Sequence, residues 1–356
     1  SMTSVWSSVI GQDHAVSLLR QLTQNPVHGY LFIGPEGCGK DEAARAFASC
    51  LVTGGDAIDS REARLIAQQS FADVHEIRRE GASILAEQAE KVIQLASRST
   101  VEADVCVIIM HEVHLMAEAA IVRLLKTLEE PPPHVRFILL ADTLVPSLTT
   151  VASRCINVLF GEMPARTIED SLLAEGVPGE LAHAVSLASS GSLTRAQLLA
   201  RDPDFLARRE MFSRVPHELD GNGHRAIALV DDVMQRIKDA AAPLEDLFKE
   251  ELAELEARIK ISGERGSGRK DLEASQKRRL RKHLTDELRN GLAAIAGVYR
   301  DAMAHGHNAH RIGEFATAID EIHRAIDRLA LNANEELLLQ ALFLRLPMVR
   351  HADLVA

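Results

Sequence analysis

The sequence predicts an α/β domain followed by helical domains, and three observations support that prediction. Up to about residue 160, short apolar segments alternate with amphipathic helical patterns, as in a mainly parallel sheet that helices cover on both faces. Beyond about residue 162 the strand patterns stop. Aromatic residues make up only 4% of the chain, and alanine and leucine fill most apolar positions, which favours helices.

Four strands and four helices are predicted in the α/β part. Each predicted strand is a nearly continuous apolar run bounded by polar or glycine residues, and each is too short for a buried helix. The strands are residues 30–33, 105–110, 136–141 and 156–160. The helices are residues 12–22, 40–51, 84–97 and 117–129. The run Pro131–Pro133 ends the last of these helices, because proline disfavours the helical conformation of the residue before it.

Three domains are expected, because 356 residues exceed what one hydrophobic core usually organises. They are a base domain, a small helical domain and a larger helical domain, over residues 1–161, 162–203 and 204–356. The last contains a long helical hairpin, residues 244–300, with a flexible glycine-rich tip at Gly263–Gly268. The hairpin carries the basic stretch Lys277–Lys282, which fits a solvated helix face as well as a contact with template DNA or an acidic partner.

Composition and charge exclude several classes of protein. With 40 Lys and Arg against 51 Asp and Glu, the formal net charge is -11, which disfavours a stand-alone DNA-binding protein because phosphate contacts need positive charge. The four cysteines form no C-x-x-C pair, which excludes a disulfide framework and a cysteine-based zinc knuckle. The sequence shows no secretory signal and no apolar run long enough to span a membrane. A cytoplasmic protein is therefore expected.

The segment Gly34-Pro-Glu-Gly-Cys-Gly-Lys40-Asp41 has the G-x-x-x-x-G-K spacing of a phosphate-binding loop. It follows a predicted strand and opens a predicted helix, as such a loop must. Gly34, Gly37 and Gly39 allow backbone N–H groups to close around phosphate oxygens, and Lys40 adds a positive charge. The next residue should be Ser or Thr, whose hydroxyl binds Mg²⁺. Here it is Asp41, which brings a negative charge towards a polyphosphate.

The second nucleotide-binding element should be an apolar strand ending in Asp-Glu, in which the aspartate anchors Mg²⁺ and the glutamate polarises the attacking water. Residues 107–110 are followed instead by His111 and Glu112. Two Mg²⁺ positions are therefore lost, and ATP hydrolysis should be slow or absent. Three interpretations stay open: an ATPase in which Asp41 itself binds Mg²⁺, nucleotide binding without turnover, and a P-loop-shaped turn without nucleotide.

Further motifs follow the phosphate-binding loop in a characteristic order. They are Gly11-Gln12, Asp73-Val-His-Glu-Ile77, Leu124-Leu-Lys-Thr-Leu-Glu-Glu-Pro-Pro132 and Ser153-Arg-Cys155. Over roughly residues 4–205 the chain thereby resembles subunits of the bacterial clamp loader, the AAA+ complex of DNA polymerase III. The resemblance implies a RecA-like AAA+ domain with a parallel sheet, a small helical lid and a C-terminal helical collar. Degenerate nucleotide motifs beside an intact Ser-Arg-Cys are typical of its delta-prime type.

The resemblance also implies a function. A subunit of this type hydrolyses no ATP itself, but places Arg154 as an arginine finger on the ATP of a neighbouring gamma/tau subunit. Arg195 matches the lid arginine that acts as the second sensor. The implied partners are the gamma/tau and delta subunits and, through this hetero-oligomer, the sliding clamp and primer-template DNA. The alternative within the family is a catalytically active, gamma/tau-like ATPase.

No cofactor is expected to be required. The resemblance implies at most weak binding of ATP or ADP at the degenerate site. Many clamp-loader subunits carry a four-cysteine zinc module after the P-loop helix, but residues 51–72 contain no cysteine and Cys50 stands alone. We therefore expect neither zinc nor another bound metal.

Overall fold

The computed structural model describes residues 3–80, 83–262, 268–305, 309–331 and 333–354. Residues 263–267, most of the predicted hairpin tip, lie outside this description. The chain divides into two compact units, Ser1–Gln197 with Gly266–Ser275, and Leu198–Arg265 with Gln276–Ala356. The three-domain division expected from the sequence stays a prediction.

The first unit is built on a five-stranded sheet in the order β2-β3-β4-β1-β5, in which every pair of neighbours is parallel. The strands are β1 (Gly29–Ile33), β2 (Val74–Ile77), β3 (Cys106–Met110), β4 (Val135–Ala141) and β5 (Ile156–Leu159). The predicted strands are thus present. The edge strand β2 was not predicted, because His75 and Glu76 interrupt its apolar pattern.

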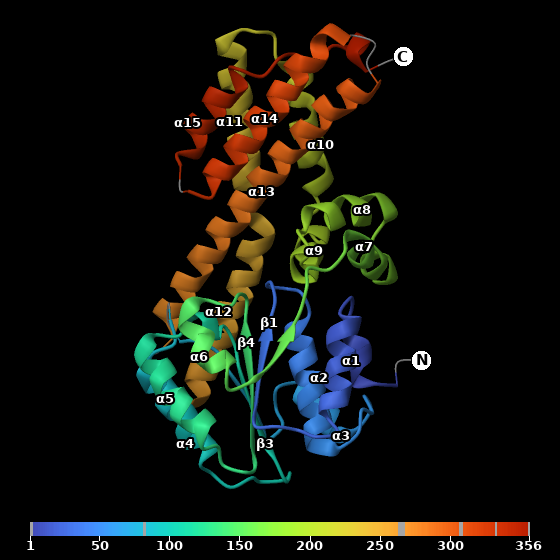
Figure 1. The fold of residues 1–356 in the computed structure, drawn as a ribbon. Coiled ribbons are helices and arrows are strands. Elements are labelled where there is room, and N and C mark those ends of the chain that lie inside the picture. Colours follow the sequence, from blue (N-terminus) through green and yellow to red (C-terminus); the bar gives the residue numbers. More distant parts are fainter. Residues whose placement is uncertain (1–2, 81–82, 263–267, 306–308, 332, 355–356) are drawn as a thin grey trace. The chain divides into compact units, whose positions relative to one another are not determined.

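Helices cover both faces of this sheet (Figure 1). Tyr30 and Phe32 of β1 point into one apolar core with α1 (Asp13–Leu22), α2 (Lys40–Thr53) and α3 (Arg61–Ala67). Leu31, between them in sequence, points into the other core, with α4 (Ala86–Ala96), α5 (Glu118–Glu129) and α6 (Thr149–Ala152). Successive residues of a strand face opposite sides, so strands buried on both faces read as continuous apolar runs.

Every described element after β5 is a helix, as the sequence predicts. Three short helices come first: α7 (Ala165–Ala174), α8 (Gly179–Ala188) and α9 (Leu193–Ala200). They are followed by α10 (Phe205–Glu218), α11 (Gly223–Asp239), α12 (Ala242–Ser262), α13 (Arg269–His305), α14 (Ile312–Leu329) and α15 (Glu335–Phe343). Single 3-10 turns occupy Val5–Ser8, Val113–Leu115, Pro146–Leu148, Ala309–Arg311 and His351–Asp353.

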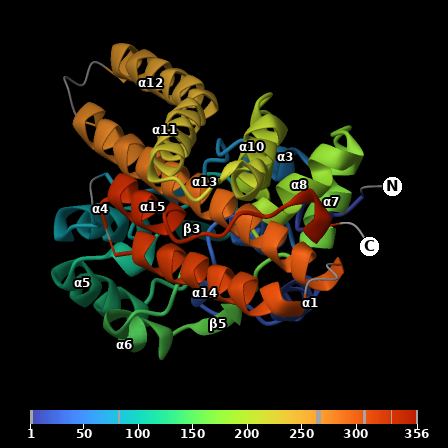
Figure 2. The same cartoon turned by 90° about the horizontal axis from the view of Figure 1, so that it is seen from above.

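The second unit has a core of its own. Helices α13 and α14 lie side by side (Figures 1 and 2), and the Tyr299 and Phe315 rings pack against each other across them with centroids 5.8 Å apart. Leu339 and Phe343 of α15 are buried in the same core. The apolar side of α15 is therefore covered within its own unit.

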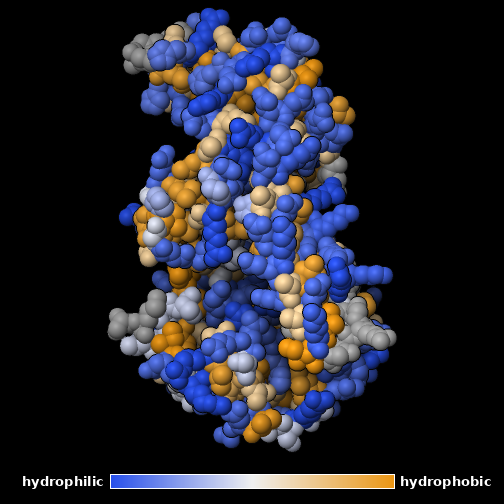
Figure 3. All heavy atoms as spheres, turned by 180° about the vertical axis from the view of Figure 1, so that it is seen from behind, coloured by the Kyte–Doolittle hydropathy of each residue, from blue (hydrophilic) through white to orange (hydrophobic). Residues whose placement is uncertain are grey.

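Hydrophilic residues dominate the face shown in Figure 3, where apolar residues form scattered patches. Within the described part of the chain, no helix combines the length and the apolar character needed to cross a membrane.

Candidate functional site

The phosphate-binding loop lies between the end of β1 and the start of α2, as predicted. Gly37 and Gly39 have φ angles of 74° and 98°, in the left-handed region that favours glycine. A Cβ atom at Gly34 would lie 2.6 Å from Cβ of Phe160, so only glycine fits there. The loop therefore adopts a conformation in which glycine is favoured at three of its positions.

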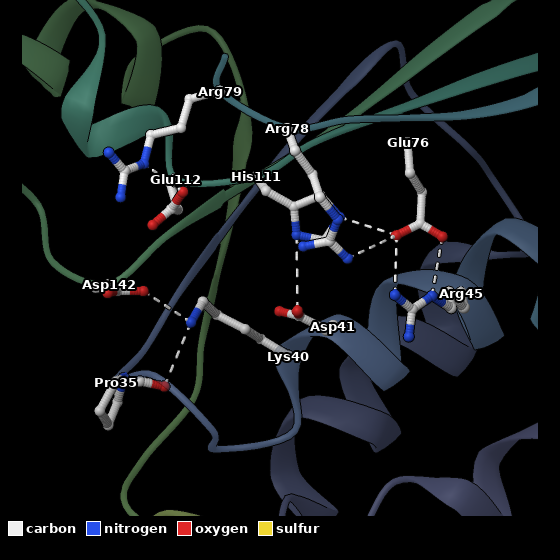
Figure 4. A network of polar contacts seen from close by, with 10 residues as sticks. All are labelled: Pro35, Lys40, Asp41, Arg45, Glu76, Arg78, Arg79, His111, Glu112 and Asp142. Atoms are coloured by element: carbon white, nitrogen blue, oxygen red, sulfur yellow. Dashed lines mark hydrogen bonds and ion pairs between the residues drawn. The ribbon is translucent and has the colours of Figure 1, made fainter. Parts of the chain in front are cut away.

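The ammonium group of Lys40 is already paired with a carboxylate of the same chain. The side chain of Lys40 is 6% exposed, and Nζ donates hydrogen bonds to Oδ1 of Asp142 at 3.0 Å and to the Pro35 carbonyl at 3.3 Å (Figure 4). Asp142 follows β4, which pairs with β1, so the sheet brings the two residues together across 102 positions. Sequence reasoning missed Asp142, although an acidic residue directly after a buried strand beside the P-loop strand was a usable signal.

His111 and Asp41 occupy the two positions where the sequence motifs lead one to expect Mg²⁺-anchoring residues, and their side chains lie close together. Nδ1 of His111 lies 3.6 Å from Oδ2 of Asp41, and its Nε2 lies 2.8 Å from Oε1 of Glu76 (Figure 4). Arg45 approaches the same Glu76 carboxylate through two hydrogen bonds, at 2.9 and 3.0 Å. Thus Asp41 and His111, two residues named from the sequence, lie close together, and Glu76 and Arg45 are additions that the sequence reading missed.

The charge state of Glu76 fixes the direction of its hydrogen bonds. Burial alone would raise the pKa of Glu76, but hydrogen bonds and charge from His111 and Arg45 outweigh it and lower the pKa to about 2. Glu76 is therefore ionised at neutral pH and can only accept. Nε2 of His111 must donate to it. With Nη2 of Arg78 3.8 Å from Oε1, three side chains surround a carboxylate that would otherwise be buried without a partner (Figure 4).

Glu112 points away from this network. Its φ angle of 54° is unusual for a residue with a side chain, and its carboxylate accepts a hydrogen bond from Nε of Arg79 at 2.7 Å (Figure 4). Sequence reasoning did not identify Arg79. The glutamate that should polarise water is thus present but held by an arginine.

Arg195 belongs to α9, and the start of that helix touches the phosphate-binding loop. The backbone N–H of Leu193 donates to the Gly37 carbonyl at 3.1 Å, and a side chain at position 37 would collide with Ser192. Nε of Arg195 lies 3.4 Å from the Ala188 carbonyl, within the same helical region. The predicted second sensor therefore lies on a helix that packs against the loop, and its Nε approaches the last residue of α8.

Arg154 lies near the amino-terminal ends of β1 and β5, opposite the end where the phosphate-binding loop begins. Its carbonyl is next to Gly29, the first residue of β1, whereas the phosphate-binding loop begins at Gly34 after the last residue. Five residues of extended chain separate the two positions by roughly 16 Å. Cys155 beside it is partly buried, and the loss of solvent around its thiol raises the pKa of that group to about 12. Arg154 thus cannot serve the nucleotide site of its own chain.

In the described ranges, no group of three or more His, Cys, Asp or Glu side chains is placed to hold a metal ion. His111 and His114, which are close in sequence, have different partners. His111 hydrogen-bonds to Glu76, whereas Nδ1 of His114 accepts a hydrogen bond from the backbone N–H of Asp142 at 3.2 Å. The expected lack of zinc stays a prediction.

Comparisons with known proteins point to one group. The family model described as "DNA polymerase III, delta subunit" matches residues 11–164. The tau/gamma subunit of DNA polymerase III from Haemophilus influenzae is 28% identical over 276 residues, which cover 69% of this chain and 39% of that protein. The delta' subunit from Bacillus subtilis is 27% identical over 217 residues, 60% of this chain and 66% of that protein.

One solved structure, a gamma subunit-related protein of DNA polymerase III from Thermotoga maritima, can be superposed on this chain. The superposition covers 92% of this chain and 97% of the other protein. Its sequence identity is 16% and its TM-score 0.42, and at that distance the likeness adds nothing to the assignment. The sequence matches span between 39% and 66% of the two curated relatives' lengths.

Proposed function

Because its residues 11–164 belong to the clamp-loader subunits of DNA polymerase III, we propose that this chain is a subunit of delta-prime type, which hydrolyses no ATP itself. In this role it assembles with gamma/tau and delta subunits in the bacterial cytoplasm. Through that complex it helps to place the sliding clamp on primer-template DNA. Its chemical contribution is Arg154, which completes the ATP site of the adjacent gamma/tau subunit.

The charge network around the phosphate-binding loop carries the first half of this proposal. Mg²⁺ prefers oxygen ligands in octahedral geometry, but a histidine stands at one anchor and the other, Asp41, faces that histidine at 3.6 Å. Lys40 is already neutralised by Asp142. A triphosphate would have to displace Asp142 and approach Asp41 without a metal ion to offset the added charge. The site therefore favours neither tight binding nor hydrolysis.

The purified chain tests this half directly. We expect no ATPase activity above background with Mg²⁺, and a fluorescent ATP analogue should bind weakly and almost equally with and without Mg²⁺. Lys40→Ala should leave the background rate unchanged. Hydrolysis that depends on both Mg²⁺ and Lys40 would refute the proposal.

An active ATPase is the second candidate, and the loop itself favours it. Gly37 and Gly39 keep the conformation of a phosphate cradle and Lys40 is retained. In that case Asp41 must leave His111 and bind Mg²⁺. Affinity for the nucleotide should then rise strongly with Mg²⁺, which separates this candidate from the proposal in the same titration.

The position of Arg154 supports the second half of the proposal. It lies roughly 16 Å along the strands from its own phosphate-binding loop, beyond the reach of an arginine side chain. Its side chain is nevertheless 34% exposed, so a neighbouring subunit can meet it. A guanidinium that cannot reach its own nucleotide but is open to solvent is suited to act in trans.

Arg154→Ala in the reconstituted complex tests the trans role. Arginine fingers contribute about 10³–10⁵ in rate, so the one ATP site beside this chain should become almost silent and total ATPase should fall by that site's share. Arg61→Ala is a matched control, because Arg61 is an exposed arginine with one acidic partner, Glu102. Full activity of the Arg154→Ala complex would show that this arginine is not a finger.

A further inference from the structure

Three residues of the same chain hold the guanidinium of Arg154. Nε and Nη2 both donate to Oε1 of Glu129, at 2.9 and 2.6 Å. Nη1 donates to the Thr150 carbonyl at 2.8 Å and to Oγ of Ser153 at 3.2 Å. Four of the five N–H groups of the guanidinium are thus used. Within the described residues, the second N–H of Nη2 has no partner.

Glu129 is the only charged member of this set, and its place in the fold is fixed. It is the last residue of α5, just before the proline run that stops the helix. Arg154 follows the short helix α6. Both helices pack on the same face of the sheet, in the core that contains Leu128 and Val151. The carboxylate is therefore presented by a rigid element and not by a loop.

We propose that Glu129 is a positioning residue for Arg154, and this inference rests on the trans role proposed above. An arginine side chain has several rotatable bonds, and ordering it during the reaction would be unfavourable. Glu129 holds the guanidinium in one orientation before the subunits meet, with an Nη2 N–H left for a phosphate oxygen of the neighbour. A donor that is already oriented stabilises the developing charge more effectively than a mobile one.

The ion pair between Arg154 and Glu129 contributes little to stability, so Glu129 can be replaced without unfolding the chain. The side chains of Arg154 and Glu129 are 34% and 51% exposed, and ion pairs of this kind contribute little to folding. Removing Glu129 should therefore change the arrangement of Arg154 without unfolding the chain. Glu130, the next residue, is also an exposed glutamate, and the hydrogen bonds of Arg154 go to Glu129, Thr150 and Ser153 instead, so Glu130 is a matched control.

The test is the ATPase of the complex reconstituted with gamma/tau and delta subunits. Glu129→Ala should lower kcat of the site that Arg154 serves by about three- to tenfold with little change in KM for ATP. Glu129→Gln should keep most of the activity, because its amide oxygen can accept the same two hydrogen bonds. Glu130→Ala should behave as wild type.

The double variant Glu129→Ala with Arg154→Ala should be no slower than Arg154→Ala alone, since Glu129 acts only through Arg154. Wild-type or higher activity of Glu129→Ala, in a complex where Arg154→Ala is defective, would overturn the positioning role. If Arg154→Ala is itself fully active, the finger assignment fails instead. The two failures are therefore distinguishable.

Discussion

The charged side chains at the two ends of the parallel strands differ in burial. Near the carboxyl ends of the strands, the side chains of Lys40, His111 and Glu76 are each 6% exposed or less, and all have partners within the chain. Before the amino end of β5, Arg154 is 34% exposed and its carboxylate partner 51%. A buried charge must be matched where it lies, whereas an exposed charge can exchange its partner at little cost. The first end, called the closed end below, is therefore paired internally, and the second, the open end, leaves its arginine partly exposed to solvent.

Removing a partner of the buried Glu76 carboxylate should have the largest effect on stability. His111→Ala removes one hydrogen bond to Glu76 while Arg45 and Arg78 remain, and losing a hydrogen bond to a buried charged group costs about 2 kcal/mol. Urea unfolding of the variant measures the change. His183→Ala, in an exposed pair with Glu169, should cost below about 1 kcal/mol. Equal losses in both variants would contradict the difference between a buried and an exposed pair.

Acid should weaken the closed end over a definite range. The pKa of Glu76 falls from 4.5 to about 2 on folding, so its contribution is complete above pH 4.5 and is lost as the pH falls towards 2. The shift corresponds to about 3 kcal/mol. The difference in unfolding free energy between the wild type and Glu76→Gln, measured by urea titration from pH 6 to pH 2, should shrink across that range. A difference that stays constant with pH would show that Glu76 is not held ionised.

Removing the cation from the open end should have the smallest effect on stability. Arg154→Ala breaks an exposed pair and should lower the unfolding free energy of the isolated chain by less than about 1 kcal/mol. Thermal unfolding of the purified chain measures this. A loss as large as that of His111→Ala would mean that Arg154 serves the fold of its own chain more than a neighbouring site.

Several parts of the fold and the site could be predicted from local sequence. The spacing from Gly34 to Lys40 identified the loop, and the apolar runs identified β1, β3, β4 and β5. The residues at the two missing Mg²⁺ anchors, Asp41 and His111, could be read directly from their motifs. Strand β2 could not, because an edge strand needs fewer apolar residues and its Glu76 faces polar partners.

The interaction partners of these residues could not be predicted from local sequence patterns, because they lie far away in the chain. Asp142 meets Lys40 from 102 positions away only because β4 lies beside β1, and Glu76 meets His111 only because β2 lies beside β3. Likewise, Glu129 belongs to a motif that was recognised, but its two hydrogen bonds with Arg154 depend on the packing of α5 and α6 against one face of the sheet.

The sequence by itself determined which residue types are present: a loop with the spacing of a phosphate-binding loop, Asp41 and His111 where metal-anchoring residues are expected, and an arginine between Ser153 and Cys155. Only the tertiary structure decided that the charged side chains near the loop pair with one another and that the arginine lies at the opposite, amino-terminal ends of the strands. The physical reason is that helix and strand periodicity is local, whereas the order of strands in a sheet sets which distant charges come within a few ångströms.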